Sequence, residues 1–402
     1  MSTLSIRPYF PFCRVRVVRQ SVSEASDRAQ IDLEPDKRFH PICHVCGKPA
    51  GAIHQWDRRL VRDLDLGATR VWINYRFRTV YCPTCQGHRV EDLEFCEPRR
   101  RVTRRLACYI YALCKVLPID TVAEHLGLDW KTVKQIDQTF LEEAFGRTIY
   151  AGLRILAVDE IAVRKGQRYL TVVLDYETGR VVWVGQDRTV ETLASFFAGM
   201  SPAGKQGLRA IAMDMWAPYL KAVQAAVPHV KIVYDLFHVV QNFNRVIDLV
   251  RLSECRRATA ADREVFKGTK YLLLSNRRTI TQPTARAHLK RLLALNETLS
   301  TVMILKDLLK RIWGYASRAW AERRVAEWCT LARTVGHRAV RAFADMLQRH
   351  REGILNHCDY PIHTSRLEGI NNTIKVIKRK AYGFHDDRYF ALKIKQAFPG
   401  TG

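Results

Sequence analysis

Hydrophobic and polar residues alternate along residues 70–78 of the chain. Val71, Ile73, Tyr75 and Phe77 fall on one side of an extended backbone, whereas Arg70, Trp72, Arg76 and Arg78 fall on the other. A period of two is typical of a half-buried strand. We therefore predict a strand with an apolar inner face and a basic outer face, on which Arg76 and Arg78 are candidate contacts to phosphate.

Residues 118–141 carry the pattern of two short helices joined by a turn. Ala123 is expected where the helices cross, Gly127 in the turn, and Val133 and Ile136 on the buried side of the second helix. This spacing is typical of a helix-turn-helix. The residues expected to project toward a DNA groove are Trp130, Lys131, Thr132, Lys134 and Gln135. An ordinary helical hairpin would give the same apolar pattern, but the arginines at 99–101 and 104–105 favour DNA.

Short apolar runs begin near residue 150. The runs at 154–160, 169–175 and 181–185 are expected to form an antiparallel meander, because residues 176–179 have the composition of a hairpin turn. A helix, a strand, a helix and a strand follow at 190–200, 208–214, 218–226 and 231–235. This order predicts a ribonuclease-H-like fold of the retroviral-integrase type.

From about 240 to 355 the pattern is helical throughout and heavily charged, which we interpret as a helical insertion. Trp313, Trp320 and Trp328 are expected to be core or packing residues of this insertion. Stacking on unpaired bases is the alternative role for them.

Composition narrows the function classes. The 402 residues include 47% hydrophobic residues, which is a globular composition, and 65 Lys and Arg against 40 Asp and Glu give a formal charge of +25. Such a charge favours a polyanionic partner, with nucleic acid as the first candidate. No apolar stretch is long enough for a membrane span, and residues 1–20 lack the apolar core of a signal peptide. We expect a cytoplasmic bacterial protein without membrane association, which is nucleoid-associated when bound.

Four of the eleven cysteines form two pairs with two-residue spacing, Cys43 with Cys46 and Cys82 with Cys85. Two such pairs supply the four thiolates of a tetrahedral structural Zn²⁺ site and clip the ends of a hairpin together. The gap between the pairs is longer than is common, so His54, His88 or Cys96 could replace one ligand. Unmetallated or redox-active cysteines are the alternative.

Two apolar strands end on an acid, at Asp159 and at Asp214. This pattern predicts two carboxylates at the ends of adjacent central strands. Phosphodiester hydrolysis and strand transfer use two Mg²⁺ (or Mn²⁺) ions about 4 Å apart, and hard cations prefer oxygen ligands. We therefore predict a two-metal site that a third carboxylate completes.

Glu368 is the candidate for the third carboxylate. In a helix it shares a face with Asn372, Lys375 and Arg379, while Ile370, Ile374 and Ile377 form the opposite, buried stripe. An acid flanked by phosphate-neutralising groups fits a DNA-lined active site. A solvated helix face is the alternative interpretation.

Other acids rank lower as metal ligands. Strand alternation turns Glu160 away from Asp159, and Asp175 is expected to end a strand at a turn. Asp235 and His238 end the fifth strand and could reach the same rim. A helix N-cap at Asp235 and a satisfied core histidine at His238 are the alternatives.

The double pair of cysteines, the helix-turn-helix, Val158–Glu160, Met213–Met215, Asp235–His238 and Glu368–Phe384 together cover nearly the whole chain. In this order they resemble the DDE transposases of bacterial insertion sequences, most closely the ISL3 family. The block after Glu368 is the most specific element of the resemblance.

The resemblance implies a ribonuclease-H-like catalytic domain that a helical insertion interrupts before its final acid. It also implies that Asp235 and His238 form a D-x-x-H motif, with His238 near the scissile phosphate. The N-terminal modules would read the terminal inverted repeats of the element, and a homodimeric synaptic complex would hold both ends.

We therefore predict a multidomain α/β chain. Its parts are an unassigned segment (1–39), a zinc-ribbon-like module (40–98), a helix-turn-helix domain (99–150), a ribonuclease-H-like catalytic domain (151–244 and 356–396) and a helical insertion domain (245–355).

The function hypothesis is a transposase that binds double-stranded element ends and target DNA and catalyses metal-dependent cleavage and strand transfer. One alternative is a non-catalytic zinc-ribbon and helix-turn-helix regulator, which would leave the strand-end acids unexplained. The other is a structure-specific nuclease on the same fold, which would cut without joining ends.

Overall fold

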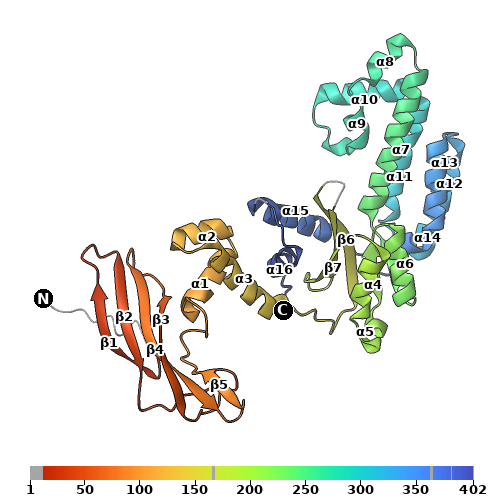
Figure 1. Ribbon diagram of the computed structural model, residues 1–402. Coiled ribbons are helices and arrows are strands. Elements are labelled where there is room, and N and C mark those ends of the chain that lie inside the picture. Colours follow the sequence, from red (N-terminus) through yellow and green to blue (C-terminus); the bar gives the residue numbers. More distant parts are fainter. Residues whose placement is uncertain (1–11, 165–167, 363–364, 382, 402) are drawn as a thin grey trace. The chain divides into compact units, whose positions relative to one another are not determined.

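The computed structural model describes residues 12–164, 168–362, 365–381 and 383–401, and within these ranges it leaves out the side chains of 163–164, 277 and 365–368. The chain divides into two compact units, Met1–Glu143 and Ala144–Gly402 (Figure 1). No helix of the described residues is long and apolar enough to cross a membrane.

A five-stranded sheet opens the first unit, with the order β1-β2-β4-β3 and with β5 paired to β4. Its strands are β1 (Val15–Val22), β2 (Arg28–Pro35), β3 (Ile53–Arg62), β4 (Arg70–Cys82) and β5 (Gly87–Val90). β2 runs parallel to β4, and the other pairs are antiparallel. The segment that the sequence left unassigned thus contributes β1 and β2 to this sheet.

The alternation predicted for β4 is confirmed as far as Phe77 and is wrong for Arg78. The four apolar residues Val71, Ile73, Tyr75 and Phe77 are at most 5% exposed. Arg78 is also buried, because β5 pairs with the end of β4 and Glu91 follows it directly opposite. The Glu91 carboxylate lies 2.6 Å from the Arg78 guanidinium and accepts the Arg78 backbone N–H at 2.7 Å. Arg78 is therefore an internal ion-pair partner and not a surface contact.

Three helices follow, α1 (Arg104–Cys114), α2 (Ile119–Leu126) and α3 (Trp130–Phe145). Gly127 ends α2 in the left-handed conformation, with φ of 61°, which glycine adopts without strain. Ala123, Val133 and Ile136 are buried between the helices. The predicted helix-turn-helix geometry is thereby confirmed.

The second unit contains a mixed five-stranded sheet with the order β10-β9-β6-β7-β8. Its strands are β6 (Ile155–Arg164), β7 (Arg168–Asp175), β8 (Val181–Gln186), β9 (Ala210–Met213) and β10 (Lys231–Tyr234). β6, β7 and β8 form the predicted antiparallel meander, whereas β6, β9 and β10 are parallel. Asp175 ends β7 at a turn, as expected, and accepts a hydrogen bond from the Thr178 hydroxyl.

Helices cover both faces of this sheet. They are α4 (Val190–Ala198), α5 (Pro202–Gly207), α6 (Ala217–Ala226), α15 (Ser365–Lys380) and α16 (Asp387–Ala397). α4 and α6 share a core with Leu156 and Val158 of β6. α15 and α16 share the other core with Ala157 and Ile161, so consecutive residues of β6 face opposite layers.

Between β10 and α15 the chain is helical, which agrees with the predicted pattern. The elements are α7 (Leu236–Arg257), α8 (Ala260–Phe266), α9 (Lys270–Leu274), η2 (Arg277–Thr279), α10 (Pro283–Leu295), α11 (Glu297–Ile312), α12 (Arg318–Thr334), α13 (Arg338–Arg349), α14 (Arg351–Leu355) and η3 (Asn356–Cys358). α11 packs along α7 and against α12 (Figure 1). Trp328 is buried in this core as predicted, but Trp320 is 51% exposed and does not belong to the core.

Candidate active site and metal centre

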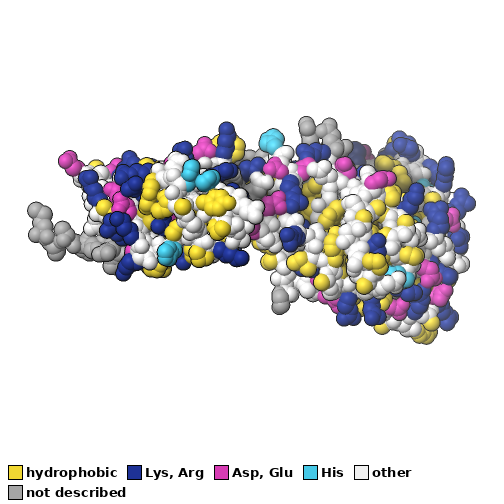
Figure 2. All heavy atoms as spheres, turned by 60° about the horizontal axis from the view of Figure 1, so that its bottom comes forward, with side chains coloured by type: hydrophobic (Ala, Val, Ile, Leu, Met, Phe, Trp, Pro, Cys, Tyr) yellow, Lys and Arg dark blue, Asp and Glu magenta, His cyan; other side chains and the backbone are white. Residues whose placement is uncertain are grey.

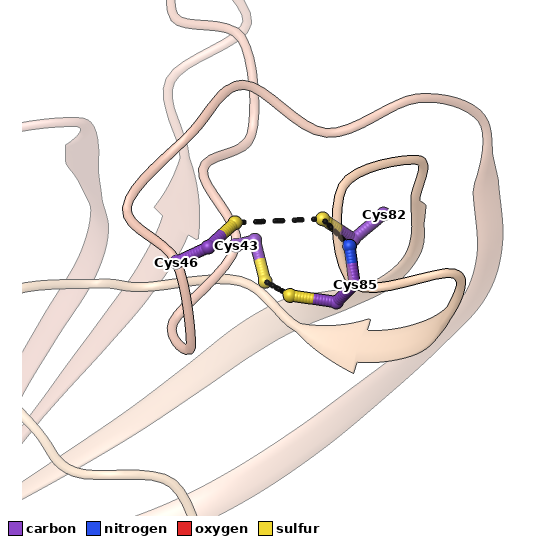
Figure 3. A group of neighbouring side chains, drawn as sticks. All are labelled: Cys43, Cys46, Cys82 and Cys85. Atoms are coloured by element: carbon purple, nitrogen blue, oxygen red, sulfur yellow. Dashed lines mark hydrogen bonds between the residues drawn. The ribbon is translucent and has the colours of Figure 1, made fainter.

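The four paired cysteines converge on one point of the first unit (Figure 3). Cys43 and Cys46 precede β3, Cys82 ends β4, and Cys85 stands in the turn to β5. The Sγ atoms of Cys43 and Cys85 are 3.9 Å apart, and those of Cys46 and Cys82 are 3.6 Å apart. A tetrahedral Zn²⁺ site with Zn–S bonds of about 2.3 Å requires S–S separations of about 3.8 Å. The donor set and its spacing therefore fit Zn²⁺.

The local backbone favours cation binding by these thiols. The backbone N–H of Cys85 donates to the Sγ of Cys82 at 3.4 Å, and this bond lowers the pKa of Cys82 to about 7. Gly47, with φ of 69°, closes the other turn by donating its N–H to the carbonyl of Cys43. Each turn thus presents two sulfur atoms on the same side.

The alternative ligands that the sequence left open lie elsewhere. The rings of His54 and His88 contact each other, with their centroids 4.1 Å apart and their planes tilted by 37°. Cys96 is buried in the core of the sheet, where its thiol donates to backbone carbonyls, including that of Val102. Among the described residues, the four cysteines are the one group of three or more possible ligands that converge in this way.

The candidate DNA-reading residues lie along the start of α3. Trp130, Lys131 and Gln135 are exposed, whereas Thr132 and Lys134 are half-buried. Asp129 begins the helix by accepting the backbone N–H groups of Lys131 and Thr132. Lys and Arg side chains are spread over the visible surface of both units (Figure 2). On β4, Arg76 is partly exposed and its guanidinium stacks on the Trp56 ring at 4.6 Å.

A cavity of about 1190 Å³ lies in the second unit where β9 and β10 end, beside Asp159 of β6. Its charged and hydrogen-bonding lining residues are Asp159, Glu160, Asp214, Trp216, Asp235, His238, Gln241, Asn242, Arg245, Lys310, Trp313, Asn371, Asn372 and Lys375. The predicted strand-end acids, the D-x-x-H pair and part of the α15 face thus line the same space. The prediction that Asp159 ends its strand is wrong, because β6 pairs with β7 beyond this acid and continues to Arg164.

Strand register explains why three of these acids line the same cavity. β6, β9 and β10 are parallel neighbours, in which Ala157, Ala212 and Val233 stand side by side. Two residues farther along these strands come Asp159, Asp214 and Asp235. Because residues two apart point to the same face of a sheet, the three carboxylates lie at one level on the α15 face.

Asp159 is held by a residue that the sequence analysis did not select. The Asn371 side-chain amide of α15 donates to Asp159 Oδ2 at 2.6 Å. Burial raises the pKa of the Asp159 carboxyl, although the nearby His238 opposes this shift. Asn371 is adjacent in sequence to the predicted Asn372, but no periodicity distinguishes the two.

Asp214 stands directly after β9, where its Oδ1 accepts the backbone N–H of Trp216 at 3.0 Å. Burial raises its pKa to about 6, and the negative charges of Glu160 and Asp159 add to this rise. Carboxylates that are buried together in this way are stabilised by a cation placed between them.

Asp235 and His238 begin α7. Asp235 is the N-cap, since its Oδ1 accepts the Phe237 N–H at 3.0 Å, so the N-cap interpretation is confirmed. Its buried Oδ2 has no hydrogen-bond partner among the described atoms and lies 3.9 Å from His238 Nε2. His238 lines the cavity with 27% of its side chain exposed, which differs from a satisfied core histidine.

Glu160 also reaches the cavity, from the opposite face of β6. Its Oε1 accepts a hydrogen bond from the Arg188 guanidinium at 2.8 Å. Arg188 stacks on the rings of Tyr169 and Trp216, at 4.0 and 4.7 Å. Nothing in the periodicity around Arg188 indicated this contact, which joins β6 to the segment after β8.

α15 brings part of its predicted polar face to the cavity. Asn372 and Lys375 line the cavity, and Ile370 and Ile374 are buried against the sheet as predicted. Arg379 is exposed one turn farther along and does not line the cavity. The backbone of Glu368 belongs to the first turns of α15, but its side chain lies outside the described residues.

Three family models match the chain. A model described as a transposase matches residues 156–394. The helix-turn-helix domain of transposase family ISL3 matches residues 91–140, and the zinc-finger of transposase IS204/IS1001/IS1096/IS1165 matches residues 40–85. The matches include the cysteine centre, α2 and α3, and most of the second unit.

Curated relatives match nearly full length. The transposase for insertion sequence element IS1001 of Bordetella parapertussis is 40% identical over 363 residues, which cover 90% of this chain and 89% of the relative. The transposase for insertion sequence element IS1557 of Mycobacterium tuberculosis is 23% identical, with coverage of 90% and 87%.

Proposed function

The chain belongs to the ISL3 family of insertion-sequence transposases, and from that premise we propose that it cleaves and joins DNA with a metal site built on Asp159, Asp214 and Glu368. The observation that carries this proposal is the parallel register of β6, β9 and β10, which brings Asp159 and Asp214 to one level in a single cavity. The basic and amide groups of α15 line the same cavity, as a phosphate substrate requires.

The second unit is, on this proposal, a ribonuclease-H-like catalytic domain formed by 151–244 and 356–396, with 245–355 as its helical insertion. An antiparallel meander continued on one edge by two parallel strands supports this assignment. The proposed N-terminal modules are the zinc ribbon (40–98), extended by β1 and β2, and the helix-turn-helix domain (99–150), of which the first unit includes the residues up to Glu143.

The residues present fit a divalent cation. Asp159 and Asp214 have raised pKa values because they are buried near other acids, and one oxygen of Asp235 and one of Glu160 have no hydrogen-bond partner among the described atoms. The third carboxylate of this proposal, Glu368, comes from the resemblance to the DDE transposases and from its place on the helix that also carries Asn371 and Lys375. When bound, two Mg²⁺ (or Mn²⁺) ions activate the attacking oxygen and stabilise the leaving oxygen.

The protein's own groups have separate roles in this proposal. Asn371 orients Asp159, His238 faces the scissile phosphate, and Lys375 with Asn372 contacts the DNA backbone. The four cysteines hold a structural Zn²⁺ that fixes the N-terminal sheet. The exposed side chains at the start of α3 read the terminal inverted repeats.

Two element ends must be cut and joined together, so we also propose a homodimer in the synaptic complex. Mass measurement of the complex with end DNA tests this point. We expect a complex of two chains with two DNA ends. A complex with a single chain in an active mixture would contradict the proposed homodimer.

The catalytic proposal is tested with DNA that carries the inverted repeats flanking the gene. Asp159→Asn, Asp214→Asn and Glu368→Gln are each expected to lower cleavage in Mg²⁺ about 10³-fold or more while end binding is retained. Asp187→Asn is the matched control, because Asp187 is an exposed acid at the end of β8 with a positive φ that asparagine tolerates. Full activity in any of the three variants removes that residue from the site.

The same assay separates the alternatives. A non-catalytic regulator would bind the ends but cleave none of them in Mg²⁺. A structure-specific nuclease would cut branched DNA and leave its products unjoined, whereas a transposase joins the cut 3′ end to target DNA only when the end sequence is intact.

A further inference from the structure

The helical part of the second unit forms one wall of the cavity at the carboxylates. Four residues of α7, His238, Gln241, Asn242 and Arg245, line the cavity from one face of that helix. Their spacing of three, four and seven residues places them on one stripe. The last turn of α11, which packs along α7, adds Lys310 to the same wall.

Arg245 and Lys310 differ from the neighbouring cations in their partners. In the described part of the chain neither makes an ion pair, and Arg245 only donates to the side-chain oxygen of Asn242 at 3.1 Å. Farther along α7, Arg251 is paired with Asp248 and Arg257 with Glu254. Arg256 and Arg311 on the same helices also make no ion pair among the described residues, but of these unpaired cations only Arg245 and Lys310 face the cavity.

We propose that Arg245 and Lys310 form a phosphate-binding site for the DNA strand that is cleaved, away from the scissile bond itself. This inference rests on the proposed function. Arg245 lies seven residues after His238, about 10 Å along the axis of α7. A DNA strand advances about 3.4 Å per nucleotide, so the contacted phosphate lies two to three nucleotides from the phosphate at His238.

The proposed site is connected to the carboxylates through α7, the first helix after β10. α7 starts with the N-cap Asp235 in the carboxylate row, so the stripe that continues to Arg245 is rigidly joined to the acids. A phosphate held by Arg245 and Lys310 fixes the register of the strand relative to the carboxylates. Arg245 and Lys310 are thus positioning residues that act through the DNA backbone.

The test combines protein variants with single neutral linkages in the DNA. One methylphosphonate is placed at each of the first five linkages on either side of the scissile bond of the cleaved strand. Cleavage is measured in Mg²⁺ with the full chain and with the Arg245→Gln/Lys310→Gln double variant. Wild type is expected to lose at least 10-fold in cleavage rate at a linkage two or three nucleotides away, and the double variant to lose a similar factor on unmodified DNA.

The decisive measurement is whether the effect of the neutral linkage depends on the presence of Arg245 and Lys310. The sensitive linkage is expected to cause no further loss in the double variant, because the contact is already absent. Multiplicative losses, or a wild type that tolerates a neutral linkage at all of these positions, overturn the inference. Arg256→Gln/Arg311→Gln is the matched control, since both arginines are exposed on the same two helices and do not line the cavity.

The comparison also separates this inference from the proposed function. If wild type does not cleave unmodified end DNA, the proposed function fails. If it cleaves normally and the coupling is absent, only the phosphate site fails. Wild-type tolerance of every neutral linkage overturns the phosphate site without any variant. If the double variant does not fold, the single variants Arg245→Gln and Lys310→Gln supply the measurement of coupling.

Discussion

Asn371 contributes to the cavity as directly as the predicted acids do. Its amide donates to Asp159 Oδ2 at 2.6 Å from the helix that also carries Glu368. A single side chain therefore couples the position of α15 to a carboxylate of the sheet. Partners that orient metal ligands in this way affect activity without binding the metal.

Asn371→Ala is expected to lower the cleavage rate about 10- to 100-fold, because the Asp159 carboxylate loses the bond that orients it. The measurement is single-turnover cleavage across a Mg²⁺ titration, in which the apparent Mg²⁺ affinity should also fall. Thr373→Ala is the control, since Thr373 is exposed on the same helix and its hydroxyl donates to the backbone carbonyl of Gly369 in that helix. Equal rates for the two variants would contradict the role of Asn371.

The carboxyl of Asp214 has a consequence for pH. Its pKa is about 6 in the fold, raised mainly by burial, against 3.8 for an ordinary aspartate. Between these values the folded chain holds a proton that the unfolded chain has released, so stability falls as the pH rises through 6. Without Mg²⁺ at pH 7, the wild type should therefore unfold at a lower temperature than Asp214→Asn does. The expected difference in the free energy of unfolding is about 3 kcal/mol.

The difference between the two proteins should shrink as the pH falls from 6 and disappear below about pH 3, where the Asp214 carboxyl is protonated in both states of the wild type. Added Mg²⁺ at pH 7 should raise the melting temperature of the wild type more than that of the variant, because the cation binds the ionised carboxylate of the folded chain. If the melting temperatures of the wild type and the variant differ by the same amount at every pH, the fold does not raise the pKa of Asp214.

At the scale of elements, the cysteine centre joins the loop before β3 to the turn between β4 and β5. Most residues of β3 are exposed or only partly buried. The apolar residues that the sheet buries therefore come mainly from β2 and β4. A metal bound at this end would replace part of the stabilisation that a larger core provides.

Cys82→Ser is expected to abolish binding of one zinc per chain and to weaken end-DNA binding at least 10-fold, since a structural zinc site stabilises the folded state. Zinc content by elemental analysis and DNA affinity are the measurements. Cys108→Ser is the control, because Cys108 is an exposed cysteine of α1 outside the centre. Wild-type protein that binds end DNA without zinc would refute the structural role.

For the whole molecule, the formal charge of +25 favours binding to DNA, and the number of contacted phosphates sets the salt dependence of that binding. Each phosphate contact lowers the slope of log affinity against log salt by about 0.9. Lys131→Ala on the exposed start of α3 should therefore reduce the steepness of the wild-type slope by about 0.9. Lys267→Ala should leave the slope unchanged, because this exposed lysine is paired with Glu264. An unchanged slope in Lys131→Ala would remove Lys131 from the DNA contacts.

Local periodicity was sufficient for several features of this protein. The four cysteines, the turn at Gly127 and the strand that ends just before Asp214 depend on residues close in sequence, and the structure contains each of them. The strand that carries Asp159 was also predicted, but it continues past the acid to Arg164. The geometry of these features follows from the repeat of a helix or a strand, which a sequence displays directly. The family was likewise evident from the order of these motifs.

Contacts between distant segments were decided only by the tertiary structure. Glu91 buries Arg78, Asn371 reaches Asp159 across 212 residues, and α7 and α11 carry Arg245 and Lys310 to the carboxylates. Pairing of this kind depends on which faces pack together and on the register between strands, and neither leaves a local pattern. Local pattern thus determined most elements of the second unit and the helix-turn-helix, but not β1 and β2, whereas packing decided which side chains meet in the cavity.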